Sequence, residues 1–387
     1  MTDSSIESFE LTHCALPLRR EHKWTGLTES IGSYLYVRLS DRDGRAGWGE
    51  APALKDWSGE FGRYFGESPG TARLVIERYL GPAVIGCVPG QIAELHDRMD
   101  RAIRGYPYAK AAIELAAYDL AGQQCGLPVH RLLGGAYRKR IPVTHSVGLI
   151  GFEEAEREAA QVASEGIRTI KIKVGVDADR DVEMVKRIRA AVGPKVDLCI
   201  DANQGYATPG EAIRTYRRIE ACDIKYFEQP VEGIDRLAEV AHAIDAPVMA
   251  DESAWNAHDV LEIAQRRAAQ IVSIYTTKPG GLYRAMEVAA VARSAGLICN
   301  VNGSAETGIG NLANLQLAAA AVPVVLSCVV PVSTPAEAQK GQIAGIYYKD
   351  DLIKEPMRLI DGAIELPAGV GMGIPVDEGK IRRYRID

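Results

Sequence analysis

Residues 169–175 read TIKIKVG, and the alternation in this stretch is the feature from which the fold can be inferred. Isoleucine and valine side chains alternate with Lys171 and Lys173, which is the period of a β-strand whose neighbouring side chains point to opposite faces. One interpretation is an edge strand that turns a lysine-bearing face to water. The other is a strand buried on both faces, in which two adjacent lysines need a chemical reason to be there.

The surrounding segments repeat one plan, an apolar strand followed by an amphipathic helix such as residues 151–166 or 179–193. Eight strands alternating with helices predict a parallel, TIM-like (β/α)8 barrel rather than a doubly wound open sheet. In such a barrel the lysines of TIKIKVG point inward from the second strand. The eight predicted strands are residues 141–147, 169–174, 197–203, 224–230, 246–252, 271–278, 297–302 and 324–330.

A charged residue lies near the end of five successive predicted strands, each one strand–loop–helix unit from the next. The carboxyl ends of barrel strands surround one mouth, where active sites of this fold lie. A single acid at a strand end more often caps a helix or forms a salt bridge, but three neighbouring carboxylates repel one another without a cation. Mg²⁺ prefers such hard oxygen ligands, so a metal site is predicted. The five residues are Lys173, Asp201, Glu228, Asp251 and Lys278.

The ends of the chain differ from the barrel pattern. Residues 1–130 are predicted to form an α+β capping domain, with a hairpin at 33–51 that turns at Asp43-Gly44 and a helix at 108–126. Residues 131–345 form the barrel that carries the active site. The final segment, 346–387, returns to short strands and turns, and we expect it to pack back on the capping domain and complete it.

Composition excludes several classes of protein. The formal net charge is −6 and no basic patch is visible, which argues against a nucleic-acid partner. The seven cysteines are scattered and lack Cys-x-x-Cys spacing, as expected in a reducing cytoplasm. The N-terminus shows no secretory signal, and the most apolar window, 312–332, contains polar residues and prolines. A cytoplasmic protein without a membrane span is therefore expected.

Five motifs in this order resemble the muconate-lactonizing subgroup of the enolase superfamily, in the mandelate racemase/muconate lactonizing enzyme family. The resemblance extends over nearly the whole chain and includes AGWGEA at 46–51 and the helix YAKAAIELAAYDLAG. It implies an enolase-type barrel with an N-terminal capping domain. The motifs are Lys-x-Lys (171, 173), Asp-x-Asn (201, 203), Glu-Gln-Pro (228–230), Asp-Glu (251, 252) and Lys-Pro-Gly-Gly (278–281).

The resemblance also implies roles for individual residues. Asp201, Glu228 and Asp251 match the ligands of Mg²⁺, for which Mn²⁺ could substitute. Lys173 and Lys278 match the acid/base lysines on opposite faces of the substrate, and Lys171 matches a supporting lysine. Further supporting or substrate-binding candidates are Asn203, Glu252, Glu306, which follows the seventh strand, His145, at the end of the first strand, and the capping-loop residues Trp24 and Trp57.

The implied chemistry is Mg²⁺-dependent abstraction or return of a proton α to the carboxylate of a small substrate. The leading hypothesis is cycloisomerisation of a muconate-like dicarboxylate. Alternatives are racemisation or epimerisation of an N-substituted amino acid or other carboxylate derivative, dehydration, and o-succinylbenzoate synthesis. Dipeptide epimerases of the subgroup carry Asp-x-Asp after the eighth strand, where this chain reads CVVPVST (328–334), so that branch is disfavoured. A silent binding protein on the same scaffold is the non-enzyme alternative. A homo-oligomer is expected.

Overall fold

The N-terminal part of the chain forms a three-stranded antiparallel sheet packed against helices. The structure is a computed structural model that describes residues 4–333 and 341–387. The predicted hairpin is confirmed, and the sheet order is β1-β2-β3. Its strands are β1 (Ile6–Ala15), β2 (Ser33–Asp41) and β3 (Ala46–Ala51), and its helices are α1 (Pro69–Val75), η2 (Ile76–Leu80), α2 (Gly81–Val84), α3 (Ile92–Ala102), α4 (Pro107–Cys125) and α5 (Val129–Leu132).

The glycines of AGWGEA allow helix α4 to lie directly on strand β3. A Cβ atom on Gly49 would lie 1.9 Å from the backbone oxygen of Ala112, and one on Gly47 would lie 2.1 Å from that of Ala116. Any side chain at either position would force the helix away from the sheet. Helix α4 ends at Gly126 in a left-handed conformation, as its sequence predicts.

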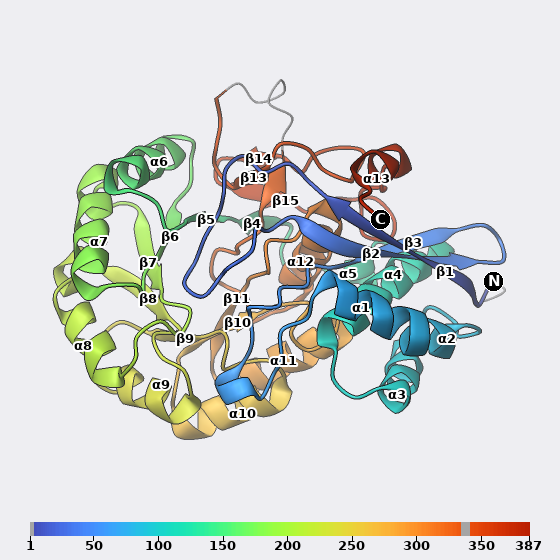
Figure 1. The fold of residues 1–387 in the computed structure, drawn as a ribbon, viewed down its shortest axis with the longest axis horizontal. Helices are drawn as coiled ribbons and strands as arrows, with labels where there is room; N and C mark the ends of the chain where they lie inside the picture. Colours follow the sequence, from blue (N-terminus) through green and yellow to red (C-terminus); the bar gives the residue numbers. More distant parts are fainter. Residues whose placement is uncertain (1–3, 334–340) are drawn as a thin grey trace.

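The second part of the chain is the expected (β/α)8-type barrel, which Figure 1 shows with its helices outside the strands. Seven strands form a continuous parallel sheet in the order β11-β10-β9-β8-β7-β6-β5. They are β5 (Thr144–Val147), β6 (Thr169–Lys173), β7 (Asp197–Asp201), β8 (Ile224–Glu228), β9 (Val248–Ala250), β10 (Ile271–Ile274) and β11 (Ile298–Val301). Its helices are α6 (Phe152–Ser164), α7 (Ala178–Val192), α8 (Pro209–Arg217), α9 (Ile234–Ala241), α10 (Ala257–Arg266), α11 (Leu282–Ser294) and α12 (Gly308–Ala320).

The predicted eighth strand, 324–330, is not a regular strand in the structure. It makes two isolated parallel bridges, from Val324 to Cys299 beside β11 and from Cys328 to Val143 beside β5. Backbone hydrogen bonds reach both neighbours, so this segment still joins the two ends of the sheet. It does not form a continuous ladder, because a single residue pair makes the bridge on each side.

The prediction was also wrong about the length of the other strands. The segment 141–147 is divided, because β4 (Arg140–Pro142) pairs with β15 in a separate sheet and only β5 joins the barrel. The sixth strand was predicted to reach Lys278, but β10 ends at Ile274 and Lys278 lies in the following turn. The polar residues of the mouth therefore lie at the strand ends and in the turns just beyond them.

The C-terminal segment returns to the N-terminal domain, as expected. The backbone N–H of Ile386 donates to the backbone oxygen of His13 on β1, and the backbones of Cys14 and Arg385 form an isolated antiparallel β-bridge. The domain boundaries themselves remain predictions, and residues 1–3 and 334–340 lie outside the described chain. The elements of this part are β12 (Val332–Ser333), β13 (Ile346–Tyr348), β14 (Leu359–Ile360), β15 (Ala363–Glu365) and α13 (Glu378–Tyr384).

A buried carboxylate ties the capping domain to the barrel. Glu50, on β3, accepts hydrogen bonds from the backbone N–H of Thr307 at 2.8 Å, its hydroxyl at 2.7 Å, and the N–H of Gly310 at 2.8 Å. Both N–H groups lie at the N-terminal end of α12, where backbone N–H groups have no partners within the helix. Glu50 of the AGWGEA motif therefore holds the cap against the barrel.

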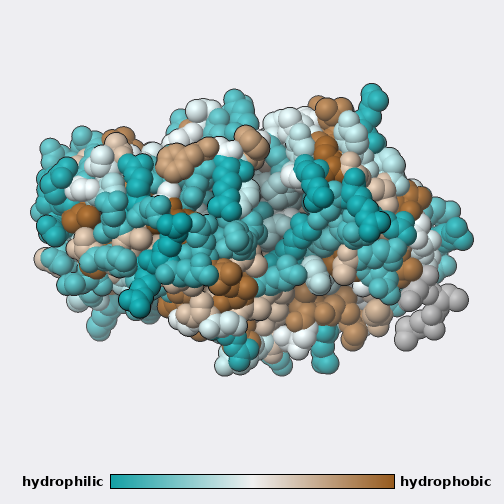
Figure 2. All heavy atoms as spheres, turned by 90° about the horizontal axis from the view of Figure 1, so that it is seen from below, coloured by the Kyte–Doolittle hydropathy of each residue, from teal (hydrophilic) through white to brown (hydrophobic). Residues whose placement is uncertain are grey.

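The outer surface mixes polar and apolar side chains. On the face shown in Figure 2, hydrophilic residues predominate, and many of the hydrophobic ones lie toward the lower edge of the view. Among the helices of residues 4–333 and 341–387, not one combines the length and apolar character that crossing a membrane requires.

Candidate active site

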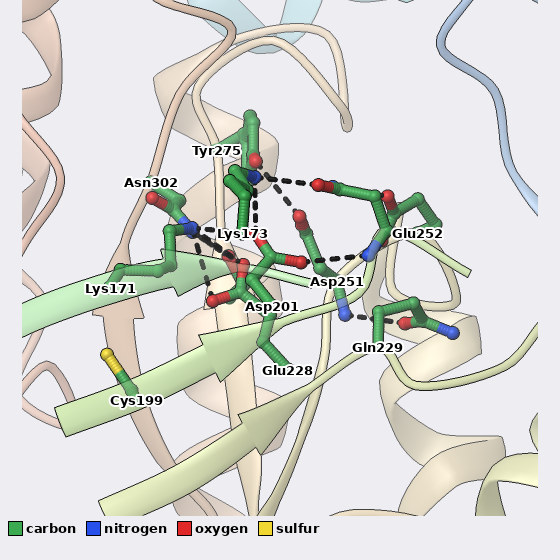
Figure 3. A network of polar contacts seen from close by, with 12 residues as sticks. Lys171, Lys173, Cys199, Asp201, Glu228, Gln229, Asp251, Glu252, Tyr275 and Asn302 are labelled. Carbon is green, nitrogen blue, oxygen red and sulfur yellow. Dashed lines mark hydrogen bonds and ion pairs between the residues drawn. The ribbon is translucent and has the colours of Figure 1, made fainter. Parts of the chain in front are cut away.

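The register of the parallel strands brings the charged residues of the mouth side by side. Lys173 is paired with Asp201 across β6 and β7, and Asp201 with Glu228 across β7 and β8. Asp251 directly follows β9, and Figure 3 shows its carboxylate beside those of Asp201 and Glu228. The side-chain alternation predicted from TIKIKVG is confirmed, because Lys171 also points toward Glu228. All of these side chains are buried.

Two lysines bind the carboxylates of β7 and β8. Lys173 Nζ donates to Asp201 Oδ2 at 2.6 Å and to Asn203 Oδ1 at 2.7 Å. Lys171 Nζ donates to both oxygens of Glu228, at 3.1 and 3.2 Å, and lies 3.1 Å from Asp201 Oδ2. These contacts are charge-assisted hydrogen bonds in a region from which bulk water is excluded, where such bonds are strong.

Lys278 lies at the other end of the row of carboxylates. Its Nζ donates to Asp251 Oδ1 at 2.7 Å, to the backbone oxygen of Asp251 at 2.9 Å and to that of Ser273 at 2.8 Å. The hydroxyl of Tyr275 donates to the second Asp251 oxygen at 3.0 Å, and Lys278 Nζ lies 4.2 Å from the centre of the Tyr275 ring. Lys173 and Lys278 therefore bind the two outer carboxylates of the row.

The electrostatics of the mouth reflect an excess of acids. Burial, followed by repulsion from Asp201, raises the pKa of Glu228, and burial together with Asp251 and Asp201 raises that of Glu252. Burial opposes ionisation of Asp201 too, but the ammonium groups of Lys173 and Lys171 lower its pKa. Four acids and three lysines are thus buried in one cluster, and burial and mutual repulsion disfavour the ionised forms of Glu228 and Glu252.

The donor set fits a hard divalent ion. Asp201, Glu228 and Asp251 supply carboxylate oxygens from three consecutive strand ends, and their mutual repulsion is the condition that a cation relieves. In the described parts of the chain no three acidic, histidine or cysteine side chains are arranged as a metal site, since ammonium groups hold the carboxylate oxygens instead. A bound ion would take over those oxygens.

A pocket opens from this cluster toward the capping domain. It encloses about 460 Å³, including its mouth. Loops of the cap, the strand ends of the barrel and the C-terminal segment all contribute to its wall. The lining residues are His22, Trp24, Leu54, Trp57, Ser146, Lys171, Lys173, Asn203, Tyr275, Asn302, Gly303, Ser304, Ala305, Val329, Pro331 and Tyr347.

The structure brings some of the weaker candidates to the pocket and places others behind its wall. Trp24, Trp57 and Asn203 line it. Glu252 lies beside them, where its Oε1 accepts from Asn203 Nδ2 at 2.9 Å and from Trp57 Nε1 at 3.3 Å. His145 is fully buried outside the lining, with Nε2 bonded to Glu158 at 2.9 Å and Nδ1 accepting from the N–H of Gly345 at 3.0 Å. Both its ring nitrogens are therefore engaged by protein groups.

Two residues that the strand-end analysis missed complete the cluster. Asn302, at the end of the seventh strand, donates from Nδ2 to Glu228 Oε1 at 2.9 Å. Gln229 accepts the backbone N–H of Asp251 at 2.8 Å and so orients the turn that carries that acid. Both carry signals that the sequence offers: Asn302 ends the segment LICNVN, and Gln229 belongs to the Glu-Gln-Pro motif. Applying the strand-end rule to every strand would have found Asn302.

Glu306 lies fully buried beneath the pocket wall, and a Cβ on Gly303 would lie 1.9 Å from its Oε2. No hydrogen-bond partner reaches either carboxylate oxygen from the described residues. Burial raises its pKa from 4.5 to about 7. The neutral acid is thus the form that the folded protein favours.

Glu306 should make stability depend on pH. Because its folded pKa is raised, the stability that it contributes is fully present below about pH 4.5 and is lost as pH rises through about 7. Between pH 5 and pH 8 the wild type should lose about 2.5 kcal/mol of unfolding free energy that Glu306→Gln does not lose. Urea denaturation at the two pH values measures this difference. The exposed Glu365→Gln serves as control, and parallel pH curves for Glu306→Gln and wild type would refute the prediction.

The barrel and its row of lysines and acids define a class of enzyme, and comparison with known proteins assigns the family. Residues 10–134 match the model of the mandelate racemase/muconate lactonizing enzyme N-terminal domain, and residues 154–380 match the enolase C-terminal domain-like model. The chain belongs to this family of the enolase superfamily and is an enzyme. Membership implies the use of a divalent metal ion.

Similar proteins include both cycloisomerases and racemases. Muconate cycloisomerase 1 of Rhodococcus opacus is 32% identical over 394 positions, which cover 99% of each chain. The crystal structure of 2-chloromuconate cycloisomerase from Rhodococcus opacus superposes with a TM-score of 0.90 at 30% identity, over 99% of this chain and 100% of that one. The N-succinyl Arg/Lys racemase of Bacillus cereus gives 0.89 at 28% identity, over 99% and 98%.

Proposed function

We propose that the protein removes and returns the proton α to the carboxylate of a small substrate, with Lys173 and Lys278 as acid/base groups. One observation carries this proposal: the two lysines bind the outer carboxylates of one row, Lys173 at Asp201 and Lys278 at Asp251. A substrate carbon held above the middle of that row would have an amine on each side. Two amines on opposite sides can exchange a proton with either face of that carbon.

We further propose that Asp201, Glu228 and Asp251 hold Mg²⁺, or Mn²⁺ in its place. When bound, the ion would stabilise negative charge that develops on the substrate carboxylate as the α proton leaves. Lys171 adds a fixed positive charge between Asp201 and Glu228, close to where that carboxylate would lie. Asn203 accepts a hydrogen bond from Lys173 and so holds the amine at the pocket surface.

Cycloisomerisation of a muconate-like dicarboxylate is the leading reaction. The full-length similarity to muconate cycloisomerase 1, at 99% of each chain, supports it. In this reaction one carboxylate oxygen adds to a carbon–carbon double bond, and the carbon α to the other carboxylate takes up one proton. A single lysine suffices for that proton.

Racemisation or epimerisation of an amino-acid derivative is the second candidate, and Asn302 favours it. Asn302 lines the pocket, and its Oδ1 has no donor partner among the described residues. A buried acceptor without a donor is costly unless a ligand supplies one. An N–H or O–H group on the substrate would do so, whereas muconate carries neither. A proton acceptor on each face is also what this reaction requires.

Hydrogen exchange in D₂O tests the proposal. The enzyme with MgCl₂ is incubated with cis,cis-muconate, N-succinyl-L-lysine, L-Ala-L-Glu and a wider panel of carboxylates, followed by mass spectrometry and polarimetry. We expect at least one carboxylate to gain solvent deuterium at its α carbon. Muconate converted to a lactone with one deuterium supports the first reaction, and loss of optical rotation with exchange supports the second. Absence of exchange across the panel, with Mg²⁺ and with Mn²⁺, would contradict the proposal and favour a silent binding protein.

A further inference from the structure

Each of the two lysines lies beneath a tryptophan, and the two tryptophans come from different loops of the capping domain. Lys173 Nζ lies 5.5 Å from the centre of the Trp24 ring, and Lys278 Nζ lies 6.0 Å from that of Trp57. Both separations are within the range at which an ammonium group is attracted to the face of an indole. Figure 1 shows the two blue segments that carry these residues reaching from the cap across the barrel, one toward β5 and β6 and the other toward α10.

The first loop is attached next to its lysine. The Thr25 hydroxyl donates to the backbone oxygen of Val174 at 2.8 Å, one residue beyond Lys173. The N–H of Leu149 donates to the oxygen of Lys23 at 2.9 Å. Trp24 lies between these two attachments, one to the residue that follows Lys173 at the end of β6 and the other to the segment that follows β5.

The second loop is attached through a stack of four aromatic rings. Tyr64 stacks on Trp255 at 4.7 Å, Trp255 lies 5.0 Å from Trp57, and Trp57 stacks on Tyr275 at 5.3 Å. The stack ends on Lys278, which is 4.2 Å from the Tyr275 ring. Such offset pairs contribute energy beyond that of burying their area. The outer ring is fixed as well, because the Tyr64 hydroxyl donates to a carboxylate oxygen of Asp259 at 2.8 Å.

The stack also covers Lys278 on the side of the pocket. Trp57 and Tyr275 line the pocket and Lys278 does not, and the Lys278 side chain is only 1% exposed. Hydrogen bonds bind the same rings to the acidic turn, because the Tyr275 hydroxyl donates to Asp251 and Trp57 Nε1 donates to Glu252. Displacing Trp57 would therefore change both the exposure of Lys278 and the groups that surround it.

We propose that Trp24 and Trp57 are positioning residues, one for each lysine. Trp24 fixes the position of the Lys173 amine, and Trp57, together with Tyr275, fixes that of the Lys278 amine. Each capping loop then serves one face of the substrate. The catalytic part of this inference rests on the proposed acid/base function. The dependence of each lysine on one tryptophan can be measured without any substrate. The two loops are also linked to each other, because Thr28 donates to Asp56 from its N–H at 3.1 Å and from its hydroxyl at 2.5 Å. The alternative hypothesis is therefore that both loops move as one unit.

Chemical labelling of the lysines tests the division. The Mg²⁺-containing enzyme is treated briefly with acetic anhydride, and acetylation at Lys173 and Lys278 is quantified by mass spectrometry of peptide fragments. Trp24→Leu should raise the labelling rate of Lys173 by at least about three-fold and leave that of Lys278 unchanged. Trp57→Leu should have the reverse effect. Trp24→Phe and Trp57→Phe, which keep an aromatic face, should restore most of the protection.

Controls separate this result from general loss of packing. Trp48→Leu makes the same substitution in β3 of the same domain, away from both lysines, and should alter neither rate. Thermal denaturation confirms that each variant is folded. Equal increases at both lysines in either tryptophan variant would show that the loops act as one unit and would overturn the proposal. No change at either lysine would overturn it as well.

A second measurement connects the division to catalysis. With a chiral carboxylate that the D₂O experiment identifies, Trp24→Leu should slow α-hydrogen exchange from one enantiomer and Trp57→Leu from the other. Equal slowing of both enantiomers by both variants would refute the assignment of each loop to one face. Selective labelling in a protein that exchanges no carboxylate would instead support the division and contradict the proposed function, so the two failures are distinguishable.

Discussion

Replacing Lys173 by alanine is expected to lower the rate of α-hydrogen exchange by about 10²- to 10⁴-fold, the contribution of a well-placed general acid/base. Lys173 lines the pocket and lies 2.6 Å from Asp201, the first acid of the row. Lys173→Arg should be equally slow, because a guanidinium keeps the positive charge but does not deprotonate. The rate is measured in D₂O by mass spectrometry, at saturating MgCl₂.

A lysine from the same sheet provides the control for this experiment. Lys225 lies on β8 with about half of its side chain exposed, and Lys225→Ala should exchange at the wild-type rate. Lys278→Ala should also be slow for a substrate that uses both faces. Exchange at an undiminished rate in both Lys173→Ala and Lys278→Ala would show that neither amine handles the proton, and the mechanism would have to be abandoned.

Replacing Glu228 by glutamine is expected to weaken Mg²⁺ binding by more than about 100-fold. This exceeds the loss of affinity expected when a side chain that only hydrogen-bonds to a metal ligand is removed. Glu228 is the central acid of the row, with Lys171 at both oxygens and Asn302 at Oε1. The amide keeps the shape of the side chain but removes the charge on which a hard cation depends. Isothermal titration with MgCl₂ measures the change directly, without reference to activity.

Glu252 is the matched control for the metal assignment. It follows Asp251 in the chain and is equally buried, but its Oε1 faces Asn203 and Trp57. Glu252→Gln should therefore change the Kd for Mg²⁺ much less than Glu228→Gln. Removal of metal with EDTA should abolish exchange reversibly, and Mn²⁺ should restore it as Mg²⁺ does. An unchanged Kd in Glu228→Gln would exclude it as a ligand.

The barrel and the order of its charged residues were predictable because they depend on short-range patterns. Alternation in TIKIKVG places Lys171 and Lys173 on one face of a strand whatever surrounds it. Parallel pairing then places Lys173, Asp201 and Glu228 beside one another. The irregularity of the eighth strand was not predictable in the same way. Residues 324–330 are apolar enough for a strand, but their pairing is limited to isolated bridges with Cys299 and Val143, which only the tertiary structure shows.

The sequence by itself therefore determined the class of fold, the side of the barrel that carries chemistry and the family to which the enzyme belongs. Only the tertiary structure decided which ammonium pairs with which acid, that His145 is held away from the pocket by Glu158 and Gly345, and that Trp24 and Trp57 each lie over a different lysine. The physical reason is the range of the interactions. Strand alternation is local in the chain, whereas these contacts join residues that only folding brings together. The two tryptophan contacts join a capping loop to a barrel lysine more than a hundred residues away.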